Sequence, residues 1–261
     1  MQRADILEPI FPAAVGVVES ESQDWLIWQL ADSAFPIGGF AHSGGLEAAW
    51  QQGEVRNGSE LLSFLKVSLH QLGRGGLLLV AAAHAEAERL DEFDELCDAF
   101  LSNHVANRAS RLQGKAFYSA VERVFHVSAK RGISWSLTDE CSRRREEADA
   151  KPNGTGLATA LRYAHFAPVF GALTRMLNIR GETVQHLFFF THLRGLLAAA
   201  VRLNIVGPME AQSMQHRLAP LAEDILRACA KRTLEDLAQT SPLLDLWQGT
   251  QDRLYSRLFQ S

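Results

Sequence analysis

Apolar side chains recur along most of this chain with the spacing of an α-helix. From Phe93 to Val105 they fall three or four positions apart, which draws one stripe on a helix expected over residues 91–113. Alternation with a period of two is nearly absent, and no segment repeats every 20–50 residues. The sequence therefore predicts an all-α fold, organised as a single helical bundle.

Capping residues and prolines indicate where further helices begin. Ser59 is expected to cap a helix with a leucine-rich face, and Thr183 a long helix after it. Pro208 suits the first turn of the next helix, where its missing N–H costs nothing, and Pro220 predicts a kink or break within that helix. Pro242 is expected to begin the last helix.

Two segments lack this periodicity and divide the chain. Residues 1–23 read as a disordered or loosely held N-terminal segment, and residues 128–156 as a surface loop that mixes charged residues with Pro152 and glycines. The bundle domain is expected over residues 24–251. Residues 252–261 form a separate C-terminal tail.

Charge and cysteine usage exclude several classes of protein. With 26 basic and 30 acidic residues the formal net charge is −4, which argues against a nucleic-acid or anionic-membrane binder. The apolar run from Leu187 to Val201 is too short and too polar to cross a bilayer. Three widely spaced cysteines argue against a disulfide framework or a cysteine zinc site, and they favour a cytoplasmic location.

The segment from Phe35 to Glu47 is the most unusual part of the chain, with four glycines and a proline within ten residues. Such a segment can be a tight corner between two helices. It can also cradle a phosphate at a helix N-terminus, but no GxxxxGK[ST] pattern and no preceding strand accompany it.

Signals for chemistry are weak. The nine histidines form no HExxH motif, so no metal site is expected. Ser43 lacks the glycine two positions before it that a nucleophile elbow requires. His42 is distinguished only by its place among the glycines.

The last ten residues are more apolar than a frayed terminus. They include Leu254, Tyr255, Leu258 and Phe259, together with Arg257. These residue types anchor interfaces, so the tail is expected to dock on the body of this protein or on a partner.

Four separated segments together resemble the urease accessory protein F (UreF) family. They are Asp32–Glu47, His165–Gly171, Ala200–Pro208 with Gln212, and Ser256–Ser261, and their order and spacing cover nearly the whole chain. The Ala41-His42 pair looks like the plant-type form of the loop.

This resemblance implies an all-α, non-enzymatic assembly chaperone in the cytoplasm. Family members dimerise and bind the D/H-type accessory protein, and the complex recruits the G-type GTPase that carries nickel to apo-urease. No cofactor is expected to bind this chain directly, although the pathway depends on nickel and GTP. Nucleic acid and membrane are not expected as partners.

The resemblance also assigns a site. The tail is expected to become ordered when the partner binds, with Arg257 meeting the glycine-rich loop opposite His42. An imidazole accepts from a guanidinium only when it is neutral, so assembly would weaken at acidic pH. The partner-binding residues expected on this basis are Pro36, Gly38, Gly39, Phe40, His42, Ser43, Gly45, Glu47, Tyr255, Arg257, Leu258 and Phe259.

Two other functions stay open at this point. One is a helical enzyme with its site at the Gly38–Gly45 loop and His42 as base. The other is a dimeric interaction module with no role in a metal pathway.

Overall fold

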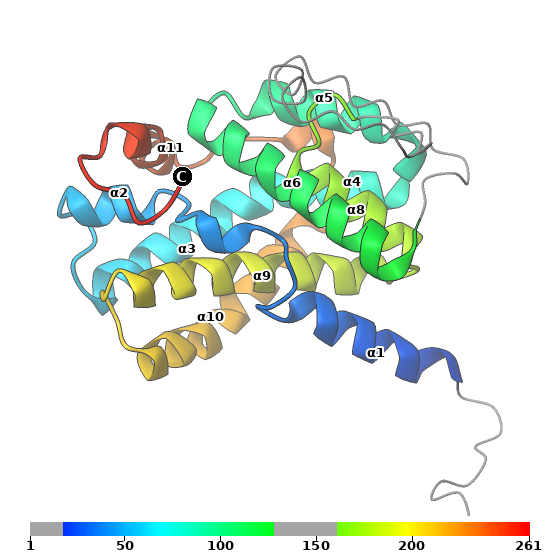
Figure 1. The fold of residues 1–261 in the computed structure, drawn as a ribbon, viewed down its shortest axis with the longest axis horizontal. Helices are drawn as coiled ribbons and strands as arrows, with labels where there is room; N and C mark the ends of the chain where they lie inside the picture. The colour runs from blue at the N-terminus through cyan, green and yellow to red at the C-terminus, as the bar shows by residue number, and fades with distance from the viewer. Residues whose placement is uncertain (1–17, 128–160) are drawn as a thin grey trace, which may run out of the picture.

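The computed structural model describes residues 18–127 and 161–261, with side chains from residue 23 onward. Within these ranges the chain forms helices and loops and no strand (Figure 1). The predicted all-α bundle is therefore confirmed. Residues 1–17 and the surface loop expected over 128–156 lie outside the described residues.

The order of the described helices along the chain can be followed in Figure 1. The α-helices are α1 (Val18–Ala31), α2 (Leu46–Gln51), α3 (Gly58–Arg74), α4 (Gly76–Ala85), α5 (Leu90–Phe100), α6 (His104–Phe125), α8 (Phe166–Met176), α9 (Gly181–Arg202), α10 (Pro208–Cys229) and α11 (Pro242–Thr250). Short 3-10 helices are η1 (Gly39–Ala41), η2 (Ala87–Arg89), η3 (Leu234–Asp236) and η4 (Gln251–Arg253).

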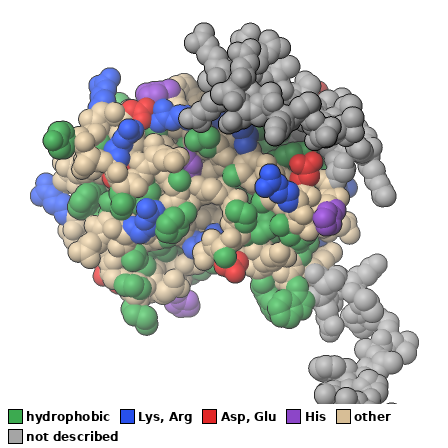
Figure 2. Space-filling view, viewed as in Figure 1, with side chains coloured by type: hydrophobic (Ala, Val, Ile, Leu, Met, Phe, Trp, Pro, Cys, Tyr) green, Lys and Arg blue, Asp and Glu red, His purple; other side chains and the backbone are tan. Residues whose placement is uncertain are grey.

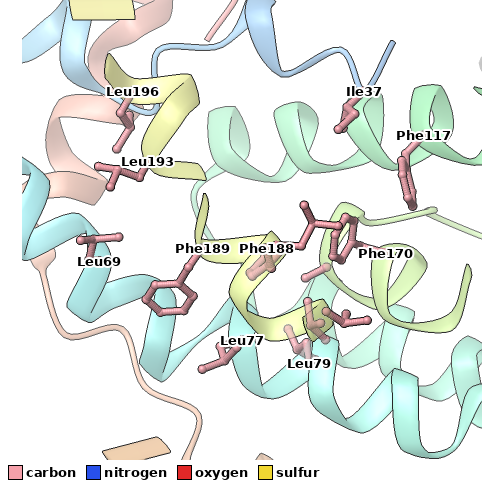
Figure 3. Close-up of a cluster of buried hydrophobic side chains, with 14 of the residues drawn as sticks. Ile37, Leu69, Leu77, Leu79, Phe117, Phe170, Phe188, Phe189, Leu193 and Leu196 are labelled. Carbon is pink, nitrogen blue, oxygen red and sulfur yellow. The ribbon is translucent and has the colours of Figure 1, made fainter. Parts of the chain in front are cut away.

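The centre of the bundle is the packing of α4 against α8, with α9 alongside. A Cβ added at Gly171 of α8 would lie 2.3 Å from the carbonyl oxygen of Val80 in α4, so the two backbones approach as closely as glycine permits. Aromatic rings fill the space between α6, α8 and α9 (Figure 3). The ring of Phe170 lies 5.1 Å from that of Phe117 and 5.5 Å from that of Phe188, a spacing typical of favourable aromatic pairs.

Helix α9 is apolar on most of its sides because it is a core helix. By length and composition it could cross a membrane, but half of its apolar window is buried inside the protein. Phe188 and Phe189 lie in the core, and the hydroxyl of Ser68 in α3 is hydrogen-bonded to His192 at 2.8 Å. The apolar surface of α9 is therefore covered by the surrounding helices.

The prediction of a single helix over residues 91–113 is wrong. The chain forms α5 and α6, separated at residues 101–103. The side chain of Asn103 accepts hydrogen bonds from the backbone N–H groups of Val105 and Ala106, which starts a new helix there. The apolar stripe continues across the break because both helices face the same core.

Other boundaries differ in detail. Asn57, rather than Ser59, caps α3. Helix α9 begins at Gly181, before Thr183, and α10 runs from Pro208 to Cys229 with Pro220 inside it. Pro208 and Pro242 begin α10 and α11 as predicted.

Helix α1 begins at Val18, so the last part of the segment expected to be flexible is helical. Further along, Trp25 and Trp28 are exposed and stack edge to face with ring centroids 5.2 Å apart. Figure 2 shows hydrophobic side chains gathered over this helix.

Candidate functional site

The glycine-rich loop, residues 35–45, joins α1 to α2 and turns through left-handed backbone conformations. Gly38, Gly44 and Gly45 have φ angles of 74°, 59° and 88°. A Cβ added at Gly45 would lie 3.1 Å from the backbone nitrogen of Gln248 in α11. Glycine is therefore required both for the turn and for the approach of α11. The loop is a tight corner, and the acidic Glu47 at the start of α2 makes it a poor phosphate cradle.

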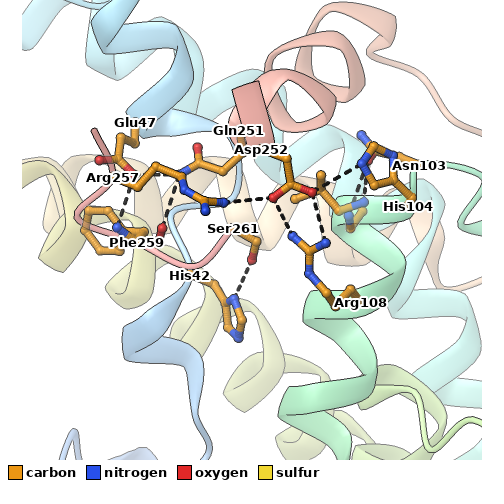
Figure 4. Close-up of polar contacts among 12 residues, drawn as sticks. His42, Glu47, Asn103, His104, Arg108, Gln251, Asp252, Arg257, Phe259 and Ser261 are labelled. Atoms are coloured by element: carbon orange, nitrogen blue, oxygen red, sulfur yellow. Dashed lines mark hydrogen bonds and ion pairs between the residues drawn. The ribbon is translucent and has the colours of Figure 1, made fainter. Parts of the chain in front are cut away.

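The tail, residues 252–261, lies against this loop (Figure 4), and the main chains of the two segments are joined by hydrogen bonds. The N–H of Gln260 donates to the carbonyl of Ala41 at 2.8 Å, and the N–H of Ser43 donates to the carbonyl of Ser261 at 2.5 Å. The side chain of Phe259 is buried in the core. The docking on the protein's own body that the tail composition predicts is present.

Glu47, in the first turn of α2, binds the main chain of the tail through hydrogen bonds. Its carboxylate is 1% exposed, and it accepts the backbone N–H groups of Leu258 at 2.6 Å and Phe259 at 3.1 Å. The side-chain amide of Gln251 donates to it at 2.5 Å. A buried carboxylate is tolerated when several donors compensate its desolvation, and here most of those donors belong to the tail.

Arg202, at the end of α9, lies between an aromatic ring of the loop and one of the tail. Its guanidinium carbon is 4.3 Å from the ring centroid of Phe40 and 4.3 Å from that of Phe259. It also donates to the carbonyl of Phe40 at 2.7 Å. Cation–π attraction to both rings joins the loop to the tail through one side chain.

His42 lies beside the tail, but it faces Ser261 rather than Arg257. The imidazole Nδ1 and the Ser261 hydroxyl are hydrogen-bonded, and the side chain of His42 is 8% exposed. Burial, followed by the positive charge of Arg108, lowers the pKa of His42 to about 4. The ring is therefore neutral from pH 6 to pH 8, and the expected acid-sensitive pairing with Arg257 is not the arrangement found.

Arg257 is bound instead to the base of the tail (Figure 4). It donates to Asp252 Oδ1 at 2.9 Å, and Arg108 of α6 holds the same carboxylate with two N–H groups at 2.8 and 2.9 Å. His104 Nε2 lies 3.4 Å from Asp252 Oδ2. The hydrogen bonds from Arg108 hold the pKa of Asp252 below its ordinary value. Arg257 and Arg108 thus share one carboxylate of the tail.

Apolar side chains of the tail and of its neighbours point outward around this contact. Tyr255 is fully exposed and Leu258 is half exposed, while Leu243 and Leu246 of α11 and Trp50 of α2 are also exposed. Helix α11 packs against α2, so these side chains come from elements that adjoin one another. We call these five residues the apolar rim.

The remaining residues of the expected site differ in their exposure to solvent. Pro36 and Phe40 are exposed, Gly38 and Gly39 are accessible, and Ser43 is fully buried beneath the tail. The structure thus brings both halves of the expected site together.

Residues outside the prediction complete the contact: Arg108, Arg202, Gln251, Asp252 and Ser261. Their spacing along the chain carries no signal, because they meet only through the fold.

The site offers little for catalysis. His42 is buried, and its Nδ1 is already bonded to Ser261. Two described cavities lie between α9 and α10 and between α3 and α10, and no loop or tail residue lines either one. Within residues 18–127 and 161–261, no group of three or more histidine, cysteine, aspartate or glutamate side chains could hold a metal ion.

Comparison with known proteins gives a consistent result. The family model UreF matches residues 55–219. The chain is 37% identical over 237 residues to urease accessory protein F of Oryza sativa subsp. indica, covering 90% of this chain and 84% of that protein. It is 36% identical over 247 residues to urease accessory protein F of Arabidopsis thaliana, covering 93% and 94% of the two chains. Urease accessory protein UreF of Rhizobium johnstonii is 27% identical over 235 residues, with 87% and 92% covered. With more than half of its length matched by the model and with relatives that align almost end to end, the chain belongs to the UreF family of urease accessory proteins.

Proposed function

We propose that this protein is a non-enzymatic scaffold that binds the D/H-type urease accessory protein and then recruits the G-type GTPase for nickel insertion into apo-urease. Nickel and GTP are handled by the partners in this proposal, and no cofactor binds this chain directly. The protein works in the cytoplasm as a homodimer.

The observation that carries the proposal is the docked tail. Glu47 fixes the tail main chain at Leu258 and Phe259, while the apolar rim around it faces outward. Aromatic and leucine side chains that remain exposed beside a rigid backbone are typical of a protein-binding surface. The proposed partner surface is therefore the apolar rim together with the loop.

Charge supports the same surface. Arg257 is partly exposed and shares Asp252 with Arg108, so two cations and a nearby histidine surround one carboxylate. Asp252 compensates only one of those positive charges. The excess fits a partner with an acidic contact residue, and it would steer association at low salt.

The test is co-purification of the full chain with the D/H-type and G-type accessory proteins. Glu47→Gln and Arg257→Ala are compared with Glu88→Gln, whose side chain is exposed on η2. We expect Glu47→Gln to release the tail and reduce complex formation at least tenfold, and Arg257→Ala to reduce GTPase recruitment. The control should behave as wild type. Wild-type recovery of all complexes by Glu47→Gln with a detached tail would overturn the assignment of this surface.

Removal of residues 252–261 separates this proposal from the enzyme alternative. The scaffold proposal predicts a helical protein, verified by circular dichroism, that no longer forms the complex. A protein whose function survives truncation, together with turnover that His42→Ala abolishes, would favour an enzyme at the loop.

A further inference from the structure

A cavity of about 550 Å³ lies between α3 and α10, apart from the loop and the tail. One part of its wall is apolar and includes Leu221, Ile225 and Ala228 of α10. The other part carries Arg74 from the end of α3 and Arg232, which follows α10. Its volume is within the range of small-molecule sites, which combine apolar walls with a few convergent polar groups.

Arg74 is held in place without having its charge neutralised. Its Nε is buried and has no hydrogen-bond partner among the described residues. Its Nη2 reaches only the carbonyl of Asp236, at 3.5 Å, and its own carbonyl accepts the N–H of Ala238 at 3.0 Å. The Arg74 side chain lines the cavity and no described carboxylate neutralises it, so an anion bound in the cavity would supply its guanidinium with a charged acceptor.

Arg232 adds a second uncompensated cation. Its Nε donates to the carbonyl of Ala228 at 3.3 Å, and no described carboxylate forms an ion pair with it or with Arg74. The acidic side chain on the cavity wall is Asp224, which is already paired with Arg227. The cavity is therefore positive although the whole chain is negative.

The two arginines share the cavity lining with Cys229. Cys229 donates its thiol to the carbonyl of Gly73 at 3.2 Å. The charges of Arg74 and Arg232 both act on this thiol, against the rise in its pKa that burial causes. Both arginines and this thiol line the same cavity. His70 also lines the cavity and offers a further ring nitrogen.

We propose that this cavity binds the phosphate group of a small phosphate monoester, with the ester's organic part against the apolar wall of α10. Two guanidinium groups supply planar pairs of N–H donors that match phosphate oxygens, and such charge-assisted bonds are stronger than neutral ones. A phosphate monoester carries close to two negative charges at neutral pH, which matches two unpaired arginines. The site is independent of the proposed scaffold function.

The test is isothermal titration calorimetry of the full chain with inorganic phosphate and with phenyl phosphate, at constant ionic strength set with potassium chloride. We expect both to bind, and phenyl phosphate to bind more tightly because its ring reaches the apolar wall. Arg74→Gln and Arg232→Gln should each weaken binding by about tenfold or more, the usual effect of losing a charge-assisted hydrogen bond. Arg217→Gln, on the exposed surface of α10 and outside the cavity lining, is the matched control.

Arg74→Lys keeps the charge and removes the planar fork, so it should bind with intermediate affinity; it also serves if Arg74→Gln does not fold. No binding of either probe to the wild type at millimolar concentration would overturn the proposal. Equal weakening in Arg217→Gln would also overturn it, because it would show a general effect of surface charge.

Discussion

The backbone N–H of Leu258 donates to the carboxylate of Glu47 at 2.6 Å, although 211 positions separate the two residues. Phe259 donates to the same group, so one side chain of α2 fixes two consecutive peptide units of the tail. The tail lacks helical bonds of its own beyond η4. Its position therefore depends on this carboxylate and on the few contacts around it.

Glu47→Gln should release the tail. The amide retains an acceptor oxygen but adds donors that face the tail's N–H groups, leaving buried groups unpaired at a cost of about 1–3 kcal/mol. Limited proteolysis should cut the variant within residues 252–261 faster than the wild type, and urea unfolding should show the loss of stability. Glu88→Gln should match the wild type in both measurements. Equal protection of the tail in both variants would contradict the role of Glu47.

Gly45→Ala and Gly39→Ala should differ sharply. Gly45 has a φ of 88°, and an added Cβ would lie 3.1 Å from Gln248 of α11, so alanine there should cost at least about 2 kcal/mol. Gly39 has no atom within 4 Å of an added Cβ and starts η1, so its alanine variant should stay within about 1 kcal/mol of the wild type. Urea denaturation of the two variants measures this difference, and equal stabilities would argue against the described loop conformation.

His42 should make the protein less stable in acid. Its pKa is about 4 in the folded protein and 6.5 for an exposed histidine, so the unfolded chain takes up the proton first as the pH falls. The free energy of unfolding keeps the full contribution of neutral His42 above pH 6.5 and loses it progressively as the pH drops toward 4. Through this histidine, the free energy of unfolding is about 2 kcal/mol lower at pH 5 than at pH 8. His42→Gln should flatten the stability curve by this amount.

His192 provides a comparison for that experiment, since burial also lowers its pKa to about 4. His192→Gln should flatten the curve by a similar amount, and the double variant with His42→Gln by about twice as much. Recruitment of partners should be unaffected by His42 protonation from pH 8 to pH 6. A curve unchanged by His42→Gln would show that the ring is exposed in solution.

Arg202→Leu should loosen the junction between loop and tail. The substitution retains apolar volume but removes the cation between Phe40 and Phe259 and the hydrogen bond to the Phe40 carbonyl, at a cost of about 1–2 kcal/mol. Faster proteolysis of the tail, with unchanged helical circular dichroism, is the expected result. Arg175→Leu, at the exposed end of α8, controls for the loss of a surface arginine.

Much of the fold follows from local pattern. The apolar spacing and the prolines at 208 and 242 locate helices because both features act within one or two turns. The break between α5 and α6 was missed because the apolar stripe runs across it, although Asn103 carries the capping signal. Continuation of α10 through Pro220 is a tertiary effect, since packing against α3 and α9 retains the helix.

Only part of the site can be predicted from short stretches of the sequence. Four glycines indicate a tight corner, and the apolar tail indicates docking. The partners within that contact depend on tertiary placement: His42 meets Ser261 at the far end of the chain, and Arg257 meets Asp252. No spacing rule links such pairs, so the resemblance of the segments could locate the site but could not assign its contacts.

Because Glu47 grips peptide N–H groups rather than side chains, the tail is held by a feature that every residue type except proline possesses. The outward side chain at position 258 is therefore free to change with little effect on docking. The exposed surface of the tail can therefore change in sequence while the hydrogen bonds between Glu47 and its main chain stay the same.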